Sequence, residues 1–399
     1  MLSSARSRIS TGFLLFAIIA LAANLRTPIV AVGPVVGFIR EDLGVSGSFI
    51  GLVAALPMLA FALFSPLAAR LARRFGMENV LVGSIVLLVA GMILRSVLPS
   101  AVLLLAGTMV IGAAIAMGNV LLPALAKRSL PTRVGLVVGA VSATMSVSSM
   151  VAAAVAVPLA QWQNWRWSLG IWALLGLVAL AAWLRIRAQG VVSVADEPQA
   201  VAGGLNVWRS RAAWCISLFM GIQSVMFYSI VNFLPSVLVE KGMTPLAAGG
   251  YSSLLQAASL AGVLAVSARF GRSTHKQRFC LLASLLLLAG VAGVWLGTPG
   301  QMWLWVSLIG IGGSGVFSIV LMLFVLRTQS INESASLSGM AQSVGYLIAV
   351  LGPLGMGVLY DHLGSWSDAM AVLVALMLVE CVLAWFAASP KTLAQSKAG

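Results

Sequence analysis

The sequence predicts an all-α integral membrane protein that crosses the bilayer twelve times. Hydrophobic residues make up 60% of the 399 residues and charged residues only 9%, which is far from the composition of a soluble domain. The mean hydropathy of the chain is +1.04. Apolar segments of about 20 residues, the length that crosses a bilayer as a helix, follow one another with short polar breaks.

The predicted helices leave no room for a long soluble domain. Arg6 and Arg8 precede a first helix of a length typical of a cytoplasmic anchor rather than of a cleaved signal peptide. In order along the chain, we expect helices at 10–38, 49–70, 79–98, 101–125, 134–160, 167–186, 211–238, 247–268, 279–297, 302–326, 336–360 and 368–388.

Basic residues are sorted between alternate loops. Counted from a cytoplasmic N-terminus, nineteen lie on the side of the termini and four, Arg40, Arg95, Arg166 and Lys241, on the other side. This positive-inside pattern predicts an inner (cytoplasmic) membrane protein with both termini in the cytoplasm. The net charge of +14 is spread over short loops with few aromatic residues, which favours contact with lipid headgroups over binding of nucleic acid.

A polar stretch at 187–210 divides the predicted helices six and six. The two halves, 1–186 and 211–399, share a local repeat, with RRFG at 73–76 after the second helix and ARFG at 268–271 after the eighth. Such tandem repeats predict two parallel six-helix bundles, joined by a cytoplasmic linker, with a solute cavity between them at the bilayer midplane.

Arg26 is the only charged residue between Thr11 and Ile39. A guanidinium at bilayer depth costs about 2.5–3.5 kcal/mol on insertion scales, so it should face a protein interior or an aqueous cavity. Pro28 cannot donate a hydrogen bond to the Asn24 carbonyl and is expected to disturb the helix there. Arg26 is therefore the first candidate to bind an anion, and Asn24, on nearly the opposite helix face, is the second.

Further polar side chains lie deep in the predicted helices. On the seventh helix Ser224, Tyr228 and Asn232 are four residues apart and share one face. Two readings stay open for these groups: a lining of the solute site, or hydrogen bonds between helices within a bundle. The candidate substrate-binding residues that accompany Arg26 and Asn24 are Asn119, Gln223, Tyr228, Asn232, Gln256, Gln342 and Tyr346.

The sequence gives no sign of catalytic or cofactor chemistry. The three cysteines lack CxxC spacing, and the predicted helices hold no metal cluster, paired carboxylates or activated nucleophile, so we expect neither an enzyme nor a cofactor. Glu380 is the one acid plainly inside a helix. We interpret it as a contact with a neighbouring helix or at the edge facing lipid. Without an acid in helices 1, 4, 7 or 10, facilitated diffusion or coupling through the substrate's own proton is expected, with a small anion or a polar planar compound as substrate.

Several segments resemble one branch of a known transporter family. The segments are NLRTP at 24–28, VGP at 32–34, SPLA at 65–68, RRFGME at 73–78, GNVLLP at 118–123 and AQSVGY at 341–346. They resemble the cyanate/nitroimidazole transporter branch of the major facilitator superfamily over nearly the whole chain. The resemblance implies a major-facilitator-type fold and a monomer that translocates a solute by rocking two halves without ATP.

The same resemblance implies a gate at the loop after the second helix. The superfamily motif there is Gly-x-x-x-Asp-Arg-x-Gly-Arg-Lys/Arg, and Arg74 and Gly76 fit its core. Arg73 replaces the expected Asp, so Arg73, Arg74 or Glu78 must use other partners. The repeat in the second half adds Arg269 and Gly271 to the candidate gating residues. The alternative function is broad-specificity drug efflux on the same fold, although the Gly-Pro-rich motif common in the fifth helix of drug exporters is replaced here by serines and a threonine between 142 and 149.

Overall fold

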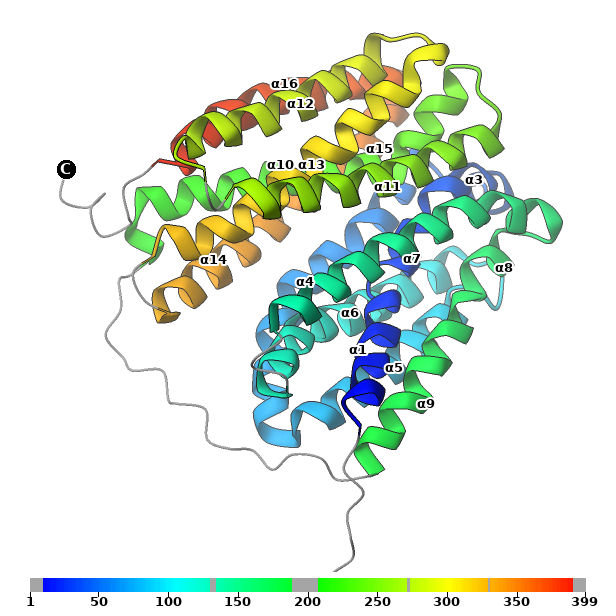
Figure 1. Ribbon diagram of the computed structural model, residues 1–399. Coiled ribbons are helices and arrows are strands. Elements are labelled where there is room, and N and C mark those ends of the chain that lie inside the picture. Colours follow the sequence, from blue (N-terminus) through cyan, green and yellow to red (C-terminus); the bar gives the residue numbers. More distant parts are fainter. Residues whose placement is uncertain (1–9, 130–133, 189–206, 271–272, 329–330, 390–399) are drawn as a thin grey trace, which may run out of the picture.

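The computed structural model describes residues 10–129, 134–188, 207–270, 273–328 and 331–389, and in these ranges the secondary structure is helical (Figure 1). Twelve segments of the described chain are long and apolar enough to cross a membrane, and each overlaps one of the predicted helices, which confirms the fold class. The α-helices are α1 (Thr11–Asn24), α2 (Thr27–Val30), α3 (Val36–Leu43), α4 (Gly47–Phe75), α5 (Met77–Leu94), α6 (Ala101–Ser129), α7 (Val134–Trp162), α8 (Trp165–Gly170), α9 (Trp172–Ala188), α10 (Arg211–Glu240), α11 (Pro245–Arg269), α12 (Lys276–Leu296), α13 (Met302–Leu326), α14 (Ile331–Ala349), α15 (Leu351–Leu363) and α16 (Trp366–Ala387).

Local chemistry fixes where many of these helices begin and end. The hydroxyls of Ser46 and Ser365 accept hydrogen bonds from backbone amides in the first turns of α4 and α16. Gly44 and Gly364 stop α3 and α15 in the left-handed region, with φ of 61° and 72°, which glycine adopts without steric cost. The membrane helices therefore end at short, well-defined turns.

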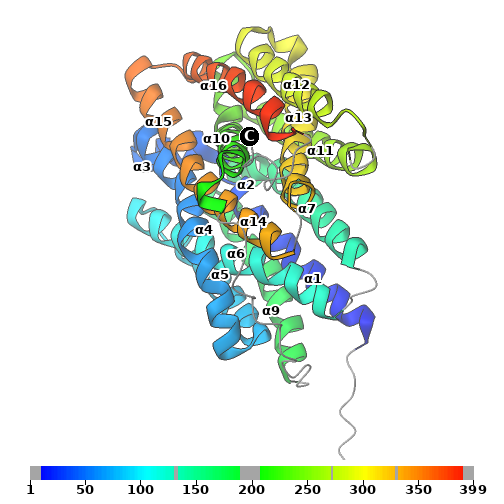
Figure 2. The ribbon, with the colours of Figure 1, turned by 90° about the vertical axis from the view of Figure 1, so that its left-hand side faces the viewer.

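Helices α1–α9 gather on one side of the molecule and α10–α16 on the other (Figure 1). The packing repeats between the halves: α4 and α5 pack on α6 in the first, as α11 and α12 pack on α13 in the second. The halves meet chiefly through α4 with α15 and α7 with α11, and also through α4 with α14 and η1 with α10; α7 and α11 lie side by side in Figure 2. The middle of the expected linker at 187–210 lies outside the described residues, and the division at this linker remains a prediction.

The first transmembrane segment is broken rather than continuous. After α1 ends at Asn24 the chain passes through α2, a 3₁₀ turn at Gly33–Val35 (η1) and α3. The predicted disturbance at Pro28 is confirmed, because Pro28 stands in the first turn of α2 directly after the break. The prolines of the fourth and seventh segments act differently: α6 and α10 run on through Pro123 and Pro235.

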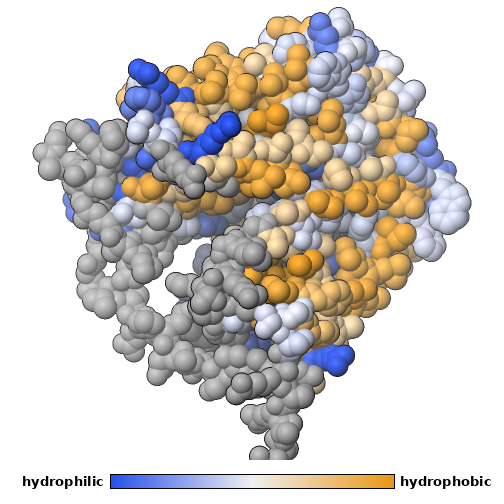
Figure 3. Space-filling model, in the orientation of Figure 1, coloured by the Kyte–Doolittle hydropathy of each residue, from blue (hydrophilic) through white to orange (hydrophobic). Residues whose placement is uncertain are grey.

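The outer faces of the bundles are apolar, as Figure 3 shows for one side of the molecule. Large exposed side chains such as Leu63, Val102, Leu174, Leu264 and Val382 lie on these faces. Exposed apolar residues are expected where lipid rather than water surrounds a helix. Both the composition and its distribution therefore suit a membrane-embedded bundle.

Candidate functional site

Arg26 occupies the break in the first transmembrane segment. Its backbone, with φ of −129° and ψ of −32°, departs from helical geometry between α1 and α2. The side chain is half-buried, and its guanidinium carbon lies 4.4 Å from the ring centroid of Phe227 on α10. No carboxylate of the described residues pairs with it, so Arg26 carries an uncompensated positive charge at the junction of the two halves.

Two tyrosines from the second half complete the surroundings of Arg26. Tyr228 on α10 and Tyr346 on α14 lie close enough to interact electrostatically with its guanidinium. The Tyr346 ring also makes an edge contact with Phe61 of α4, at 5.4 Å between centroids. Rings of the second half thus surround a cation of the first half, an arrangement suited to a planar or anionic ligand.

The other candidate residues divide into those that face hydrogen-bond partners and those that lack them. Gln223 Nε2 donates to the Gly313 carbonyl at 3.1 Å, Asn232 Nδ2 donates to the Tyr228 carbonyl at 2.7 Å, and Gln342 Nε2 donates to Ser338 Oγ at 2.8 Å. Gln256 is buried and its Oε1 has no partner, whereas Asn119 is exposed on α6. The structure therefore brings Tyr228 and Tyr346 to Arg26 and gives Gln223, Asn232 and Gln342 contacts within their own half.

Asn24 points away from Arg26, as its position on the opposite helix face predicts. Its Nδ2 donates to the carbonyls of Ala20, at 2.8 Å, and of Leu175 on α9, at 3.2 Å. The side chain is fully buried between these helices. The bond to Ala20 lies within α1 and the bond to Leu175 joins α1 to α9, while Oδ1 has no partner.

The candidate gating residues lie at the end of the molecule where α1 begins and α16 ends, which we call the terminal end. Arg74 is exposed, with its guanidinium 5.2 Å from the Phe75 ring, and Gly76 joins α4 to α5 with φ of 84°. Glu78 stands in the first turn of α5, and Arg269 is exposed in the last turn of α11. The side chain of Arg73 and the whole of Gly271 lie outside the described residues.

Arg95 is a second buried cation, which the charge pattern only counted at the far side. It follows the last residue of α5, and only 1% of it is exposed, a burial that the charge pattern does not predict. Its Nη1 donates to the Pro28 carbonyl at 2.9 Å, while Nε and Nη2 have no partner. The side chain leaves the end of α5 and turns inward to the broken first segment, a direction that hydropathy does not reveal.

Residues of both halves close the opposite end of the molecule, which we call the far end. The Asp361 carboxylate at the end of α15 accepts hydrogen bonds from the backbone amides of Gly47 and Ser48, each at 2.8 Å, and from the Ser48 hydroxyl. The Arg40 guanidinium lies over the Tyr360 ring, 4.5 Å from its centroid. The halves approach here and diverge toward the terminal end (Figure 1).

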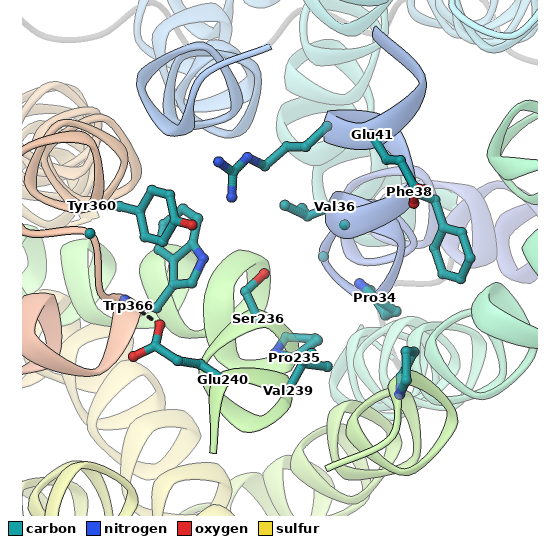
Figure 4. A pocket seen from close by; sticks show the side chains of 15 residues that line it. Pro34, Val36, Phe38, Glu41, Pro235, Ser236, Val239, Glu240, Tyr360 and Trp366 are labelled. Atoms are coloured by element: carbon teal, nitrogen blue, oxygen red, sulfur yellow. Dashed lines mark hydrogen bonds between the residues drawn. The ribbon is translucent and has the colours of Figure 1, made fainter. Parts of the chain in front are cut away.

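A pocket of about 470 Å³ opens at the far end between α3, α10 and the α15–α16 turn. Figure 4 shows Ser236 and Glu240 of α10 facing it, with Tyr360 and Trp366 along one wall. Glu240 accepts a hydrogen bond from the Trp366 backbone amide at 2.6 Å, so its carboxylate is engaged at the start of α16. Arg40 and Tyr360, whose contact helps to close the far end, both line this pocket, so it is formed by residues of the two halves.

Two membrane-embedded helix bundles that surround a charged site at their junction define a multi-pass membrane transporter. The Major Facilitator Superfamily model matches residues 12–353. The chain is 37% identical over 371 residues to the 2-nitroimidazole transporter of Escherichia coli (strain K12), with 92% of this chain and 93% of that protein covered. It is 27% identical over 373 residues to the cyanate transport protein CynX of the same organism, with 92% and 96% covered.

A solved structure agrees in fold. A bacterial homolog of the human lysosomal transporter Spinster, in an inward-facing and occupied conformation, superposes with a TM-score of 0.76 over 94% of this chain and 96% of that chain, at 14% identity. The chain belongs to the major facilitator superfamily, in its cyanate/nitroimidazole branch, and it is a transporter rather than an enzyme.

Proposed function

We propose that this protein carries a small anionic or polar nitrogen-containing solute, of cyanate or nitroimidazole type, by alternating access, with Arg26 as its main substrate contact. The observation that supports this function is the uncompensated guanidinium of Arg26 at a helix break between the two halves. A cation without a protein counter-ion in a low-dielectric site binds an anion through charge-assisted hydrogen bonds. The names of the two curated relatives fit a solute of this chemistry.

Tyr228, Tyr346 and Phe227 supply the rest of this site in the proposal. The tyrosine hydroxyls can donate hydrogen bonds to the oxygen atoms of a nitro group or to the terminal atoms of cyanate. The Phe227 face holds the Arg26 guanidinium in place, so the arginine is already oriented when the solute arrives. Asn119, which is exposed on α6, and Gln256, with its unpartnered Oε1, are the next candidates to meet the solute.

The positive-inside pattern orients the molecule in this proposal. With the terminal end in the cytoplasm, the contact at the far end closes the periplasmic side and the conformation is inward-facing. Transport then requires the contacts of Asp361 with α4, and of Arg40 with Tyr360, to separate while the terminal end closes. The residues that close the terminal end are expected to include Arg73, Arg74, Gly76, Glu78, Arg269 and Gly271.

No carboxylate of the described residues is found to act on Arg26, so coupling through a protein carboxylate has no support there. Glu380 is fully buried between α12 and α16, where Ser284 Oγ lies 3.5 Å from its Oε1, so it is an interhelix contact away from the junction of the halves. Uniport, or co-transport of the substrate's own proton, needs no such group and is the mode that we propose. The protein works as a monomer in this scheme, since each chain supplies both halves of the site.

Binding measurements on an Arg26→Ala variant test the proposed site. Cyanate and a 2-nitroimidazole should raise the unfolding temperature of the purified protein and enter proteoliposomes containing it. Loss of a hydrogen bond to a charged partner is worth about 1.5–3 kcal/mol, so Arg26→Ala should weaken binding about 10- to 150-fold. Arg26→Lys should recover only part of it, because an ammonium cannot replace the planar fork.

Arg187→Ala is the matched control. Arg187 is exposed in the last turn of α9, so this substitution removes the same charge away from the site. Unfolding without ligand checks that both variants fold. If lipophilic cations stabilise the wild type and Arg26→Ala equally, while cyanate and nitroimidazole stabilise neither, the proposed site is wrong and drug efflux becomes the better function.

A further inference from the structure

A basic pocket lies at the terminal end of the second half, away from the proposed solute site. It has a volume of about 400 Å³ and lies where α12 begins and α13 and α16 end. His275, Lys276, Arg278 and Arg327 line it, and none of its described lining residues is acidic. Its chemistry therefore favours a ligand that carries negative charge.

Arg327 is the most deeply placed of these side chains, with only 4% of its surface exposed. Its Nη1 donates to the carbonyls of Ala387, at 3.2 Å, and Ser389, at 2.5 Å, while Nε has no partner. Burial lowers the pKa of the Arg327 guanidinium, because desolvation disfavours the charged form. An anion in the pocket would offset that cost and satisfy the free donor.

The first turn of α12 adds to the positive potential. This helix of 21 residues begins at Lys276, and the preceding His275 makes no side-chain capping hydrogen bond. Its first backbone amides therefore remain available for an anion at the positive end of the helix dipole. Arg278, two residues into the helix, is exposed and free to reach the same anion.

The pocket lies at the expected boundary between hydrocarbon and water. It sits at the ends of three transmembrane segments, and its wall includes Leu326 and Trp385, which are 41% and 40% exposed. Tryptophan is typical of this level of a membrane. A ligand with an anionic head and an apolar tail would contact the cations and this apolar wall together.

We propose that this pocket binds the phosphate headgroup of an anionic membrane lipid. Arg327 and the first turn of α12 hold the phosphate, Lys276 and Arg278 neutralise it, and the acyl chains run along Leu326 and Trp385. The C-terminal segment beyond residue 389 is a poor occupant, because Lys391 and Lys397 are its only charged side chains. Basic pockets between transmembrane helices bind lipid headgroups elsewhere by the same combination of charge and depth.

Lipid titration of the purified full-length protein tests the site. Phosphatidylglycerol, added to protein in neutral detergent, should raise the unfolding temperature, and phosphatidylcholine should do so much less. Each basic residue near a headgroup contributes about fivefold in affinity, so Lys276→Gln with Arg278→Gln should raise the half-maximal lipid concentration about 25-fold. Arg187→Gln, which removes an exposed charge at the terminal end of the first half, should leave that concentration unchanged.

The remaining outcomes separate lipid from other anions. Equal stabilisation by inorganic phosphate without lipid would show that a soluble anion is the ligand and would overturn the proposal. If Arg187→Gln weakened lipid binding as much as the double variant, lipid would bind through the overall charge of the protein, which would also overturn the proposal. Solute binding serves as an independent readout, because the double variant leaves the surroundings of Arg26 intact.

Discussion

Arg26 and Arg95 show how two arginines in one bundle take different roles. Both lack a carboxylate partner among the described residues, yet Arg26 faces rings of the second half while Arg95 holds the Pro28 carbonyl inside the first. Pro28 thus lies two residues after Arg26, and its carbonyl accepts a hydrogen bond from Arg95. At the residue scale, Arg95 acts as a support for the position of Arg26, because it anchors the chain two residues beyond it.

Substitution of Arg95 should therefore affect stability and solute binding together. Arg95→Ala leaves the buried Pro28 carbonyl without its partner and opens a cavity, so we expect a loss of about 1–3 kcal/mol in unfolding free energy. Solute affinity should fall as well, because the break at Arg26 loosens. Thermal unfolding with and without ligand measures both, and Arg166→Ala, at a half-buried cation of the far end, is the control. An unchanged unfolding temperature in Arg95→Ala would contradict this role.

At the scale of elements, close backbone approach joins the halves. The Val231 carbonyl of α10 loses its helical N–H partner to Pro235, and Gly33 of η1 lies directly against it. A Cβ at position 33 would lie 3.2 Å from the Asn232 Cα and closer still to the Val231 oxygen. The broken first segment can therefore press against α10 only with glycine at this position.

Gly33→Ala should hinder closure of the far end. The added methyl meets backbone, which cannot move aside as a side chain could, so the halves should separate there. Spin labels at the exposed residues Glu41 and His362 would report the separation as a longer distance, and transport should slow more than tenfold. Gly37→Ala is the matched control, since a Cβ at Gly37 meets nothing within 4 Å. Identical distance distributions in the two variants would exclude the contact as the determinant of closure.

At the scale of the whole molecule, the halves are held by contacts of their ends. Asp361 accepts three hydrogen bonds from the first turn of α4, and Arg40 covers the Tyr360 ring next to it. A carboxylate at a helix N-terminus is favoured by the helix dipole as well as by the free amides. Asp361 is exposed and Arg40 and Tyr360 are half-buried, so these contacts reach water and suit a joint that must open in every transport cycle.

Asp361→Asn should shift the molecule toward the state that is open at the far end. The amide keeps the size of the side chain but loses the charge, and exposed charged contacts contribute up to about 1 kcal/mol, so the open population should rise about two- to fivefold. The same pair of spin labels measures it. Asp368→Asn in the first turn of α16 is the control, because Asp368 belongs to the second half alone. A population that is unaltered in Asp361→Asn would mean that apolar packing alone closes this end.

Much of the fold was predictable because bilayer thickness sets the length of each apolar segment. All twelve segments could be located, and Pro28 indicated the break beside Arg26. The candidate site was predictable only in part. Tyr228 and Tyr346 were found by their helical spacing, whereas Phe227 and Phe61 carry no polar signal that separates them from other apolar residues of a membrane helix.

The sequence by itself determined the membrane class, the number of segments, the family branch and the exceptional charge of Arg26, since each depends on composition or on neighbours along the chain. Only the tertiary structure decided which groups meet. It turned Arg95 inward to Pro28, set Asp361 on the first turn of α4 and gathered four basic residues around one pocket. The physical reason is that these contacts depend on how distant helices are rotated against one another. Apolar residues are spread almost evenly around each helix, so their pattern does not encode that rotation.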